Sequence, residues 1–301
     1  MLKVNQLTKK FGTFTALNGV NFEVGKGEVF GFIGPNGAGK STTIRVLLGL
    51  IQSTSGDATI FGKNVWTEAV EIHKRLAYVP GDVHLWPNLT GGEVIDLFGK
   101  LQGGMNREKR DELIARFDLD PTKKCKTYSK GNRQKIALVS AFASEADLFI
   151  LDEPTSGLDP LMEHIFQESV LELKQQGKSV LLSSHILSEV EKLCDRIGII
   201  RQGEIIESGT MGELRHLTRT NFIVETKKPI LSLETLNGIH QIEKQGDTLS
   251  FQVDSKHIDE VIRHISQFGV LKIESTPPTL EDLFMQHYET KSTTHHGGRL
   301  V

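Results

Sequence analysis

The chain has little cysteine, no long apolar run and no large excess of one charge. Its two cysteines, Cys125 and Cys194, are too few and too far apart for a disulfide framework or a zinc site, which fits a reducing compartment. No stretch approaches the roughly 18 apolar residues that a membrane-spanning helix needs, and residues 1–6 lack the apolar core of a signal peptide. If the protein works at a membrane, we therefore expect another chain to provide the passage.

The charge balance also bears on partners. A formal net charge of −3 gives no basic field of the kind that nucleic-acid-binding proteins carry, so no nucleic-acid partner is expected. Apolar residues make up 38% and charged residues 24% of the chain, which indicates a globular protein with a substantial core. The length of 301 residues predicts one large domain, or one domain with a smaller companion.

Residues 34–41, which read Gly-Pro-Asn-Gly-Ala-Gly-Lys-Ser, are the most informative segment that the chain does contain. They fit the pattern Gly-x-x-x-x-Gly-Lys-Ser/Thr, in which backbone N–H groups wrap the phosphates of a nucleotide. An apolar run at residues 29–33 precedes them and helical spacing follows at residues 42–50, which argues against a mere glycine-rich turn. The octet therefore predicts binding of a nucleoside triphosphate, with Lys40 at the β and γ phosphates and Ser41 on Mg²⁺. The nucleotide-binding residues predicted in this segment are Gly34, Pro35, Asn36, Gly37, Ala38, Gly39, Lys40, Ser41 and Thr42.

The pattern of apolar residues predicts an α/β fold for the nucleotide-binding domain, which we place at residues 1–218. Buried parallel strands with helical patterns between them are expected at residues 29–33, 76–79, 148–151, 179–182 and 197–200. The first 30 residues and residues 57–61 alternate apolar and polar, which predicts a small antiparallel subdomain against the core. Residues 91–145 look helical and are expected to form an insertion.

A small accessory α+β domain is predicted at residues 219–290. Alternating, strand-like segments lie at residues 221–226, 239–244, 249–253 and 270–274. Ser255 is the expected N-cap of a helix, and residues 279–282 resemble a capping box. The apolar face of that helix would carry Ile258, Val261, Ile262 and Ile265. Residues 291–301 are expected to be disordered, with His295 and His296 solvated rather than metal-binding.

Two carboxylates, Asp152 and Glu153, follow the apolar run at residues 148–151. Such a pair is usually only a polar strand end, but ligands bind at the carboxyl ends of parallel strands, and this sheet should also carry the phosphate loop. Asp152 is therefore predicted to hold Mg²⁺ through water, and Glu153 to polarise the water that attacks the γ-phosphate.

Further motifs, in order along residues 1 to about 215, carry a family resemblance. Residues 128–135, Tyr-Ser-Lys-Gly-Asn-Arg-Gln-Lys, resemble the signature of ABC-type ATPases, usually written LSGGQ. Residues 156–159, Ser-Gly-Leu-Asp, are similar to the D-loop of that family, and Ser184-His185 to its switch histidine. With the octet and the Asp-Glu pair, these motifs imply the P-loop NTPase fold of ABC ATPases and the hydrolysis of ATP, with ATP and Mg²⁺ as cofactors.

The resemblance implies roles for individual residues. Ser129 and Gly131 would contact ATP held by a second protomer, which implies a head-to-tail homodimer around two nucleotides. Asp159, in the D-loop, is also a predicted nucleotide-binding residue. His185 would hydrogen-bond the γ-phosphate and the attacking water, although by themselves His185 would be a structural residue and Ser129 an ordinary N-cap. The catalytic residues implied are Lys40, Glu153 and His185.

Phe11 sits where the family stacks an aromatic ring on adenine, and it is the predicted stacking residue. Phe14 is close by in the sequence, and either ring could be packing instead.

The chain departs from the family pattern at two places. In the signature, Lys130 replaces the first of two glycines and Asn132 replaces the usual glutamine, whereas the serine and the second glycine are kept. After residues 78–80 the family has the glutamine of its Q-loop, but this chain has Gly81 and then Asp82. Because glycine has no side chain to offer Mg²⁺ or water, we hypothesise that Asp82 takes that role.

The resemblance implies the ATP-hydrolysing subunit of an ABC transporter, on the cytoplasmic face of the cell membrane, with separate integral-membrane permease subunits. Residues 78–82, 128–132 and 278–284 look like those of bacterial exporters of drugs and bacteriocins, so export is favoured over import. ATP would close the dimer, and the helical insertion would pass that motion to the permease. The alternatives are a soluble ABC ATPase acting on ribosomes or nucleic acid, and a nucleotide-binding regulator without turnover.

Overall fold

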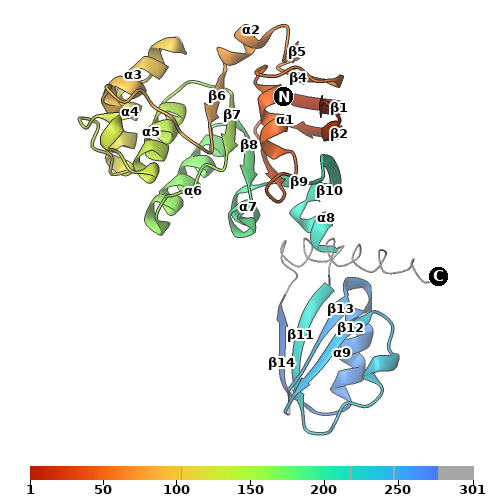
Figure 1. Ribbon diagram of the computed structural model, residues 1–301. Coiled ribbons are helices and arrows are strands. Elements are labelled where there is room, and N and C mark those ends of the chain that lie inside the picture. The colour runs from red at the N-terminus through yellow and green to blue at the C-terminus, as the bar shows by residue number, and fades with distance from the viewer. Residues whose placement is uncertain (103, 217–218, 247, 277–301) are drawn as a thin grey trace, which may run out of the picture. The chain divides into compact units, whose positions relative to one another are not determined.

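The computed structural model describes residues 1–102, 104–216, 219–246 and 248–276, and it divides into two compact units (Figure 1). The first unit is Met1–Ser208, and the second begins at Gly209 rather than at residue 219. The predicted boundary followed the start of the alternating strand pattern, and so it left helix α8 (Met211–His216) in the first unit.

The first unit is built on a six-stranded sheet in the order β10-β9-β3-β8-β7-β6. The pairs β3–β8, β3–β9, β7–β8 and β6–β7 are parallel, as the sequence predicted. Every residue of β3, β7 and β8 is buried, which is why these strands read as continuous apolar runs. The strands are β3 (Val29–Ile33), β6 (Leu76–Val79), β7 (Leu148–Asp152), β8 (Ser179–Ser184), β9 (Arg196–Arg201) and β10 (Glu204–Thr210).

Helices pack against this sheet. Helix α1 (Lys40–Leu47) contacts β7, and α2 (Ala69–His73) contacts β6. Helix α6 (Pro160–Gln175) contacts β8, and α7 (Leu187–Leu193) contacts β3 and β8. A βα-wound sheet of this kind gathers its loops at the carboxyl ends of the strands, where the site lies.

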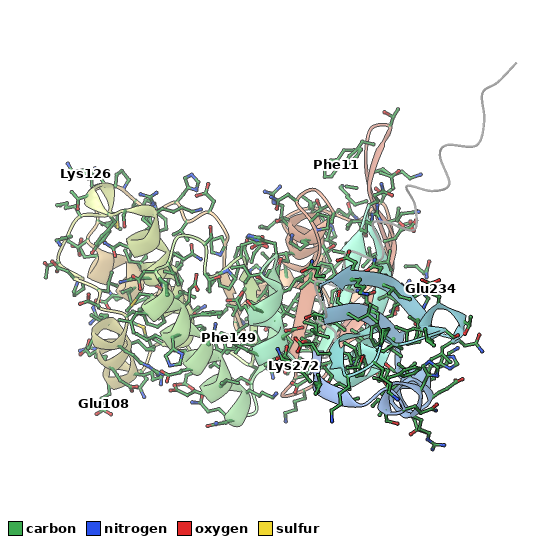
Figure 2. All side chains as sticks on the ribbon, turned by 90° about the horizontal axis from the view of Figure 1, so that it is seen from below. Phe11, Glu108, Lys126, Phe149, Glu234 and Lys272 are labelled. Carbon is green, nitrogen blue, oxygen red and sulfur yellow. The ribbon has the colours of Figure 1, made fainter. Side chains whose placement is uncertain are left out.

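An antiparallel sheet in the order β2-β1-β4-β5 covers part of the same core. The Phe22 ring of β2 stacks on Phe30 and Phe32 of β3, with ring centroids 5.3 and 5.1 Å apart, and so joins the two sheets. Figure 2 labels Phe149 inside this unit and Phe11 at the tip of the β1–β2 hairpin. The strands are β1 (Leu2–Phe11), β2 (Phe14–Val24), β4 (Ser55–Ile60) and β5 (Lys63–Asn64).

The predicted helical segment consists of α3 (Gly91–Leu101), α4 (Arg107–Arg116), the 3₁₀ turn η1 (Cys125–Thr127) and α5 (Lys130–Phe142). These helices lie together at one end of the first unit (Figure 1), and α5 contacts α3, α4 and β6. Thr90 begins α3 with a capping box, in which Thr90 Oγ1 accepts from Glu93 N–H and Glu93 accepts from Thr90 N–H. None of the helices in the described ranges is long and apolar enough to cross a membrane.

The second unit is an antiparallel sheet in the order β12-β13-β11-β14, with α9 packed on it. The Phe222 and Phe251 rings stack in its core with centroids 5.8 Å apart. Its elements are β11 (Arg219–Thr226), η2 (Leu233–Thr235), β12 (Ile239–Gln245), β13 (Thr248–Asp254), η3 (Ser255–His257), α9 (Ile258–Ser266) and β14 (Val270–Thr276).

Two expectations for this helix were wrong. Ser255 begins the 3₁₀ turn η3, so the N-cap of α9 is His257, two residues after the predicted one. Val261 and Ile265 are buried, whereas Ile262 is 41% exposed and lies off the apolar face. The predictions for residues 279–282 and 291–301 lie outside the described residues.

Candidate functional site

The phosphate loop joins β3 to α1, and its backbone needs glycine at three places. Gly37 and Gly39 have φ of 81° and 117°, which side-chain-bearing residues rarely adopt. A Cβ on Gly34 would lie 2.3 Å from the carbonyl oxygen of Ile200. Gly39 gives α1 no side-chain cap, so the first N–H groups of the helix remain available for an anion.

Lys40 links this loop to the end of β7. Its side chain is only 6% exposed, and its Nζ donates to the carbonyl oxygens of Gly34 at 2.5 Å and Pro35 at 3.4 Å. The same Nζ lies 3.4 Å from Glu153 Oε1. The ammonium group therefore stands between the phosphate loop and the carboxylate predicted to activate water.

Glu153 and His185 meet at the ends of two neighbouring parallel strands. Glu153 follows β7 and His185 follows β8, and His185 Nδ1 is in hydrogen-bond contact with Glu153 Oε2. Glu153 has φ of 49°, a conformation rare for a residue with a side chain, and such positions cluster at functional sites. The structure thus brings together all three residues predicted to be catalytic.

Asp152 has the environment of a cation ligand. Its Oδ1 is buried with no hydrogen-bond partner, and burial raises the pKa of this carboxyl, while the hydroxyls of Ser183 and Ser41 favour its charged form. An unpartnered buried carboxylate oxygen beside the Ser41 hydroxyl suits a hard divalent cation. Within the described residues no group of three or more His, Cys, Asp or Glu could hold a metal, so water and phosphate oxygens would complete such a site.

Asp82 lies on the same hollow as the predicted Mg²⁺ ligands. This hollow of about 420 Å³ is lined by Asn36, Ser41, Arg45, Tyr78, Pro80, Gly81, Asp82, Asp152, Glu153, Ser156 and His185. A Cβ on Gly81 would lie 3.1 Å from the backbone oxygen of Asp152, so the glycine itself passes close to β7. The Asp82 side chain is 75% exposed, and its Oδ2 lies 3.8 Å from His84 Nε2.

The aromatic ring beside the phosphate loop is Phe14, not Phe11. A second hollow of about 280 Å³ is lined by Phe14, Ala16, Pro35, Asn36, Gly37, Gly39, Lys40, Ser41, Thr42 and Glu153. Phe11 is absent from that lining, is half exposed, and has Lys9 Nζ 5.0 Å from its ring centroid. Phe11 and Phe14 are direct cross-strand partners at the hairpin end, which is why their positions in the sequence could not separate them.

Ser129, Gly131 and Asp159 line neither hollow, and each has a local role. Ser129 is the N-cap of α5 and its Oγ accepts from Asn132 N–H at 3.2 Å. Asp159 is the N-cap of α6 and accepts from Met162 N–H at 3.0 Å. Gly131 passes so close to the 156–158 turn that a Cβ would lie 2.4 Å from Gly157 O. Within one chain these residues are therefore apart from the phosphate loop.

Sequence reasoning missed three residues around the site. Gln134, 1% exposed, donates through Nε2 to Pro154 O at 3.0 Å and so fixes the turn after Glu153. Tyr78 lines the larger hollow, and burial, followed by the charge of Asp152, raises its pKa to about 12. Glu189, 3% exposed, has a pKa raised to about 7, chiefly by burial.

The chain is similar to known proteins over both units. The sequence profile described as "ABC transporter" matches residues 17–156, and the profile "ATP-binding protein DrrA1-3-like, C-terminal domain" matches residues 209–288. The linearmycin resistance ATP-binding protein LnrL of Bacillus subtilis is 32% identical over 302 residues, covering 95% of this chain and 97% of its own. The bacitracin transport ATP-binding protein BcrA of Bacillus licheniformis is 33% identical over 304 residues, covering 95% and 96%.

A solved structure shares the fold of the first unit. The dimeric post-hydrolysis state of the ATP-binding cassette MJ0796, bound to ADP and Pi, superposes with a TM-score of 0.64 at 26% identity. The match covers 70% of this chain and 99% of that one. The fold and the site therefore define a P-loop ATPase of the ATP-binding-cassette class. The chain belongs to the ATP-binding proteins of ABC transporters.

Proposed function

We propose that this chain is the ATP-hydrolysing subunit of a drug exporter, working as a homodimer on separate membrane permease subunits. The observation that carries the proposal is that Lys40 and His185 both contact Glu153, and that Glu153 and His185 line one hollow with Asp152 and Ser41. In phosphoryl transfer most of the catalysis comes from positioning and charge neutralisation, and these side chains supply both.

Each residue has a distinct task in this proposal. Lys40 neutralises charge on the β and γ phosphates, and Glu153 accepts the proton of the attacking water. His185 keeps the Glu153 carboxylate aimed and donates toward the γ-phosphate. Ser41 and Asp152, with Asp82, would hold Mg²⁺, which would neutralise part of the phosphate charge.

The dimer is supported by residues that one chain leaves unused. Ser129 and Gly131 stand at the N-terminus of α5, a 13-residue helix whose first N–H groups can meet a phosphate. Neither residue reaches the phosphate loop of its own chain, so a nucleotide contact would come from a second copy. MJ0796, with the same fold, is a dimer.

The permease contact is proposed at the helical insertion. Trp86 is 50% exposed and its ring lies 6.1 Å from that of Phe98 on α3. These residues adjoin a small apolar hollow between α3, α5 and the turn at Pro80, next to the site. A short helix of a permease chain seated there would be moved by any shift of that turn. Export is supported by the relatives named for resistance to linearmycin and transport of bacitracin.

The test is ATP hydrolysis by the purified chain and by Glu153→Gln. We expect the variant to bind ATP with unchanged affinity and to lose steady hydrolysis by at least about a hundredfold, because the side chain keeps its size and loses the base. Thr90→Ser, remote from the site, is the matched control. Hydrolysis by the variant at the wild-type rate would overturn the proposal, and isolation of the chain with ribosomes rather than a membrane protein would favour the soluble alternative.

A further inference from the structure

Lys130, which stands where the family signature has glycine, has a specific partner in its own chain. Its Nζ donates to Ser156 Oγ at 2.7 Å. Lys130 is the first residue of α5, and Ser156 lies in the turn that follows β7. A glycine at position 130 could not make this contact, so the link belongs to the departure from the family pattern.

The two segments are also packed closely around this bond. The Lys130 stem lies 3.4 Å from the position that a Cβ on Gly157 would occupy, and Gly157 has φ of 84°. A Cβ on Gly131 would lie 2.4 Å from Gly157 O, and Gln134 Nε2 donates to Pro154 O at 3.0 Å. The first turn of α5 therefore contacts the residues on both sides of Ser156.

Ser156 connects this contact to the catalytic carboxylate. Its N–H donates to Glu153 O at 3.1 Å, and its side chain lines the same hollow as Glu153 and His185. Glu153 holds a φ of 49°, which the surrounding structure must maintain. A tether at Ser156 therefore acts on the backbone that aims the Glu153 carboxylate.

We propose that Lys130 is a positioning residue, which ties the start of α5 to Ser156 and so holds the 153–156 turn in the conformation that hydrolysis requires. The inference rests on the proposed function, because it takes Glu153 as the base. In this chain, the start of α5 at Lys130 and the turn at residues 153–156 therefore move together.

The experiment compares full-length Lys130→Met, Lys130→Arg and Ser156→Ala. Lys130→Met keeps the aliphatic stem on Gly157 and loses the Nζ hydrogen-bond donor. We therefore expect its kcat to fall severalfold, up to about tenfold, with KM and melting temperature unchanged. Lys130→Arg keeps a hydrogen-bond donor at this position and should recover most of the wild-type kcat. The double variant Lys130→Met, Ser156→Ala should have a kcat no lower than that of either single variant, because both substitutions remove the same hydrogen bond.

Amide hydrogen exchange without nucleotide tests the tether independently of turnover. The N–H groups of Ser156 and Leu158 bond to Glu153 O and Thr155 O, and we expect both to exchange faster in Lys130→Met. If these amides exchange in Lys130→Met at the wild-type rate, the tether is overturned. It is also overturned if the losses of kcat add in the double variant, or if the single variants raise KM and leave kcat unchanged. If the wild type itself does not hydrolyse ATP, the proposed function fails while the exchange result still decides the tether.

Discussion

Glu189 is a buried carboxyl group whose charge the fold disfavours. Neither of its oxygens has a hydrogen-bond partner, and the hydroxyls of Ser184 and Thr155 are the polar groups that favour its charged form. Burial is the main cause of its raised pKa, and the carboxylates of Glu163 and Glu153 raise it further. Burial, and after it the charge of Glu189, also raises the pKa of the Cys194 thiol at the end of α7.

This environment predicts a pH dependence of stability. Between the ordinary pKa of 4.5 and the folded value of about 7, the folded chain holds a proton that the unfolded chain has released. Stability therefore falls as pH rises through this window, by at most about 3 kcal/mol from a shift of this size. Glu189→Gln should lose this dependence, so its melting temperature should match wild type at pH 5 and exceed it at pH 8. If the melting temperatures of the two proteins change in parallel with pH, Glu189 is not the group responsible.

Asp82 gives a second prediction at this scale. If it takes the place of the missing Q-loop glutamine, Asp82→Ala should hydrolyse ATP about tenfold more slowly and need more Mg²⁺ for half-maximal rate, because an oxygen near the metal is lost. Asp82→Asn, which keeps a side-chain oxygen, is the matched variant and should be milder. An unchanged rate and Mg²⁺ dependence in Asp82→Ala would show that Asp82 does not replace the Q-loop glutamine.

The predictable site residues are those with a short-range pattern. Asp152 and Glu153 stand at the end of an apolar strand and Lys40 ends the glycine-rich loop after another, and parallel strands bring their ends to one edge. The choice between Phe11 and Phe14 was beyond the sequence, because it depends on how the hairpin lies over the loop. The Lys130–Ser156 bond joins residues 26 apart, in a geometry that no spacing rule encodes.

At the scale of elements, α3 depends on its cap. Thr90 and Glu93 form two reciprocal hydrogen bonds: Thr90 Oγ1 accepts from Glu93 N–H, and Thr90 N–H donates to the Glu93 carboxylate. The second bond lowers the pKa of the Glu93 carboxyl. Thr90→Ala should destabilise α3 by about 1 kcal/mol, seen as faster exchange of its first-turn amides, whereas Thr90→Ser should keep the cap. Equal exchange in the alanine variant would contradict this account.

Strands were easier to predict than helix starts. The buried parallel strands are apolar throughout, so their limits are visible in the sequence. The start of α9 was misplaced because the residues after β13 form a 3₁₀ turn first, and Ser at such a position suits a turn as well as a cap.

At the scale of the whole molecule, the first unit contains every residue assigned to hydrolysis. The second unit has a core of its own, with Phe222, Phe251 and Val261 buried in it. The apolar runs, with helical patterns between them, were enough to predict the α/β class. In the sequence, a second copy was implied by the resemblance alone. In the structure, Ser129 and Gly131 line neither of the two hollows beside the phosphate loop of their own chain.

The shared site is tested most directly by the molar mass of full-length Glu153→Gln in solution with Mg²⁺ and ATP. The account predicts a dimer with ATP and a monomer with ADP, because the triphosphate joins the two copies. Adding Ser129→Asp keeps an N-cap on α5 but places a negative charge where phosphate would bind, and it should abolish the dimer. A monomer with ATP, or a dimer that survives Ser129→Asp, would contradict it.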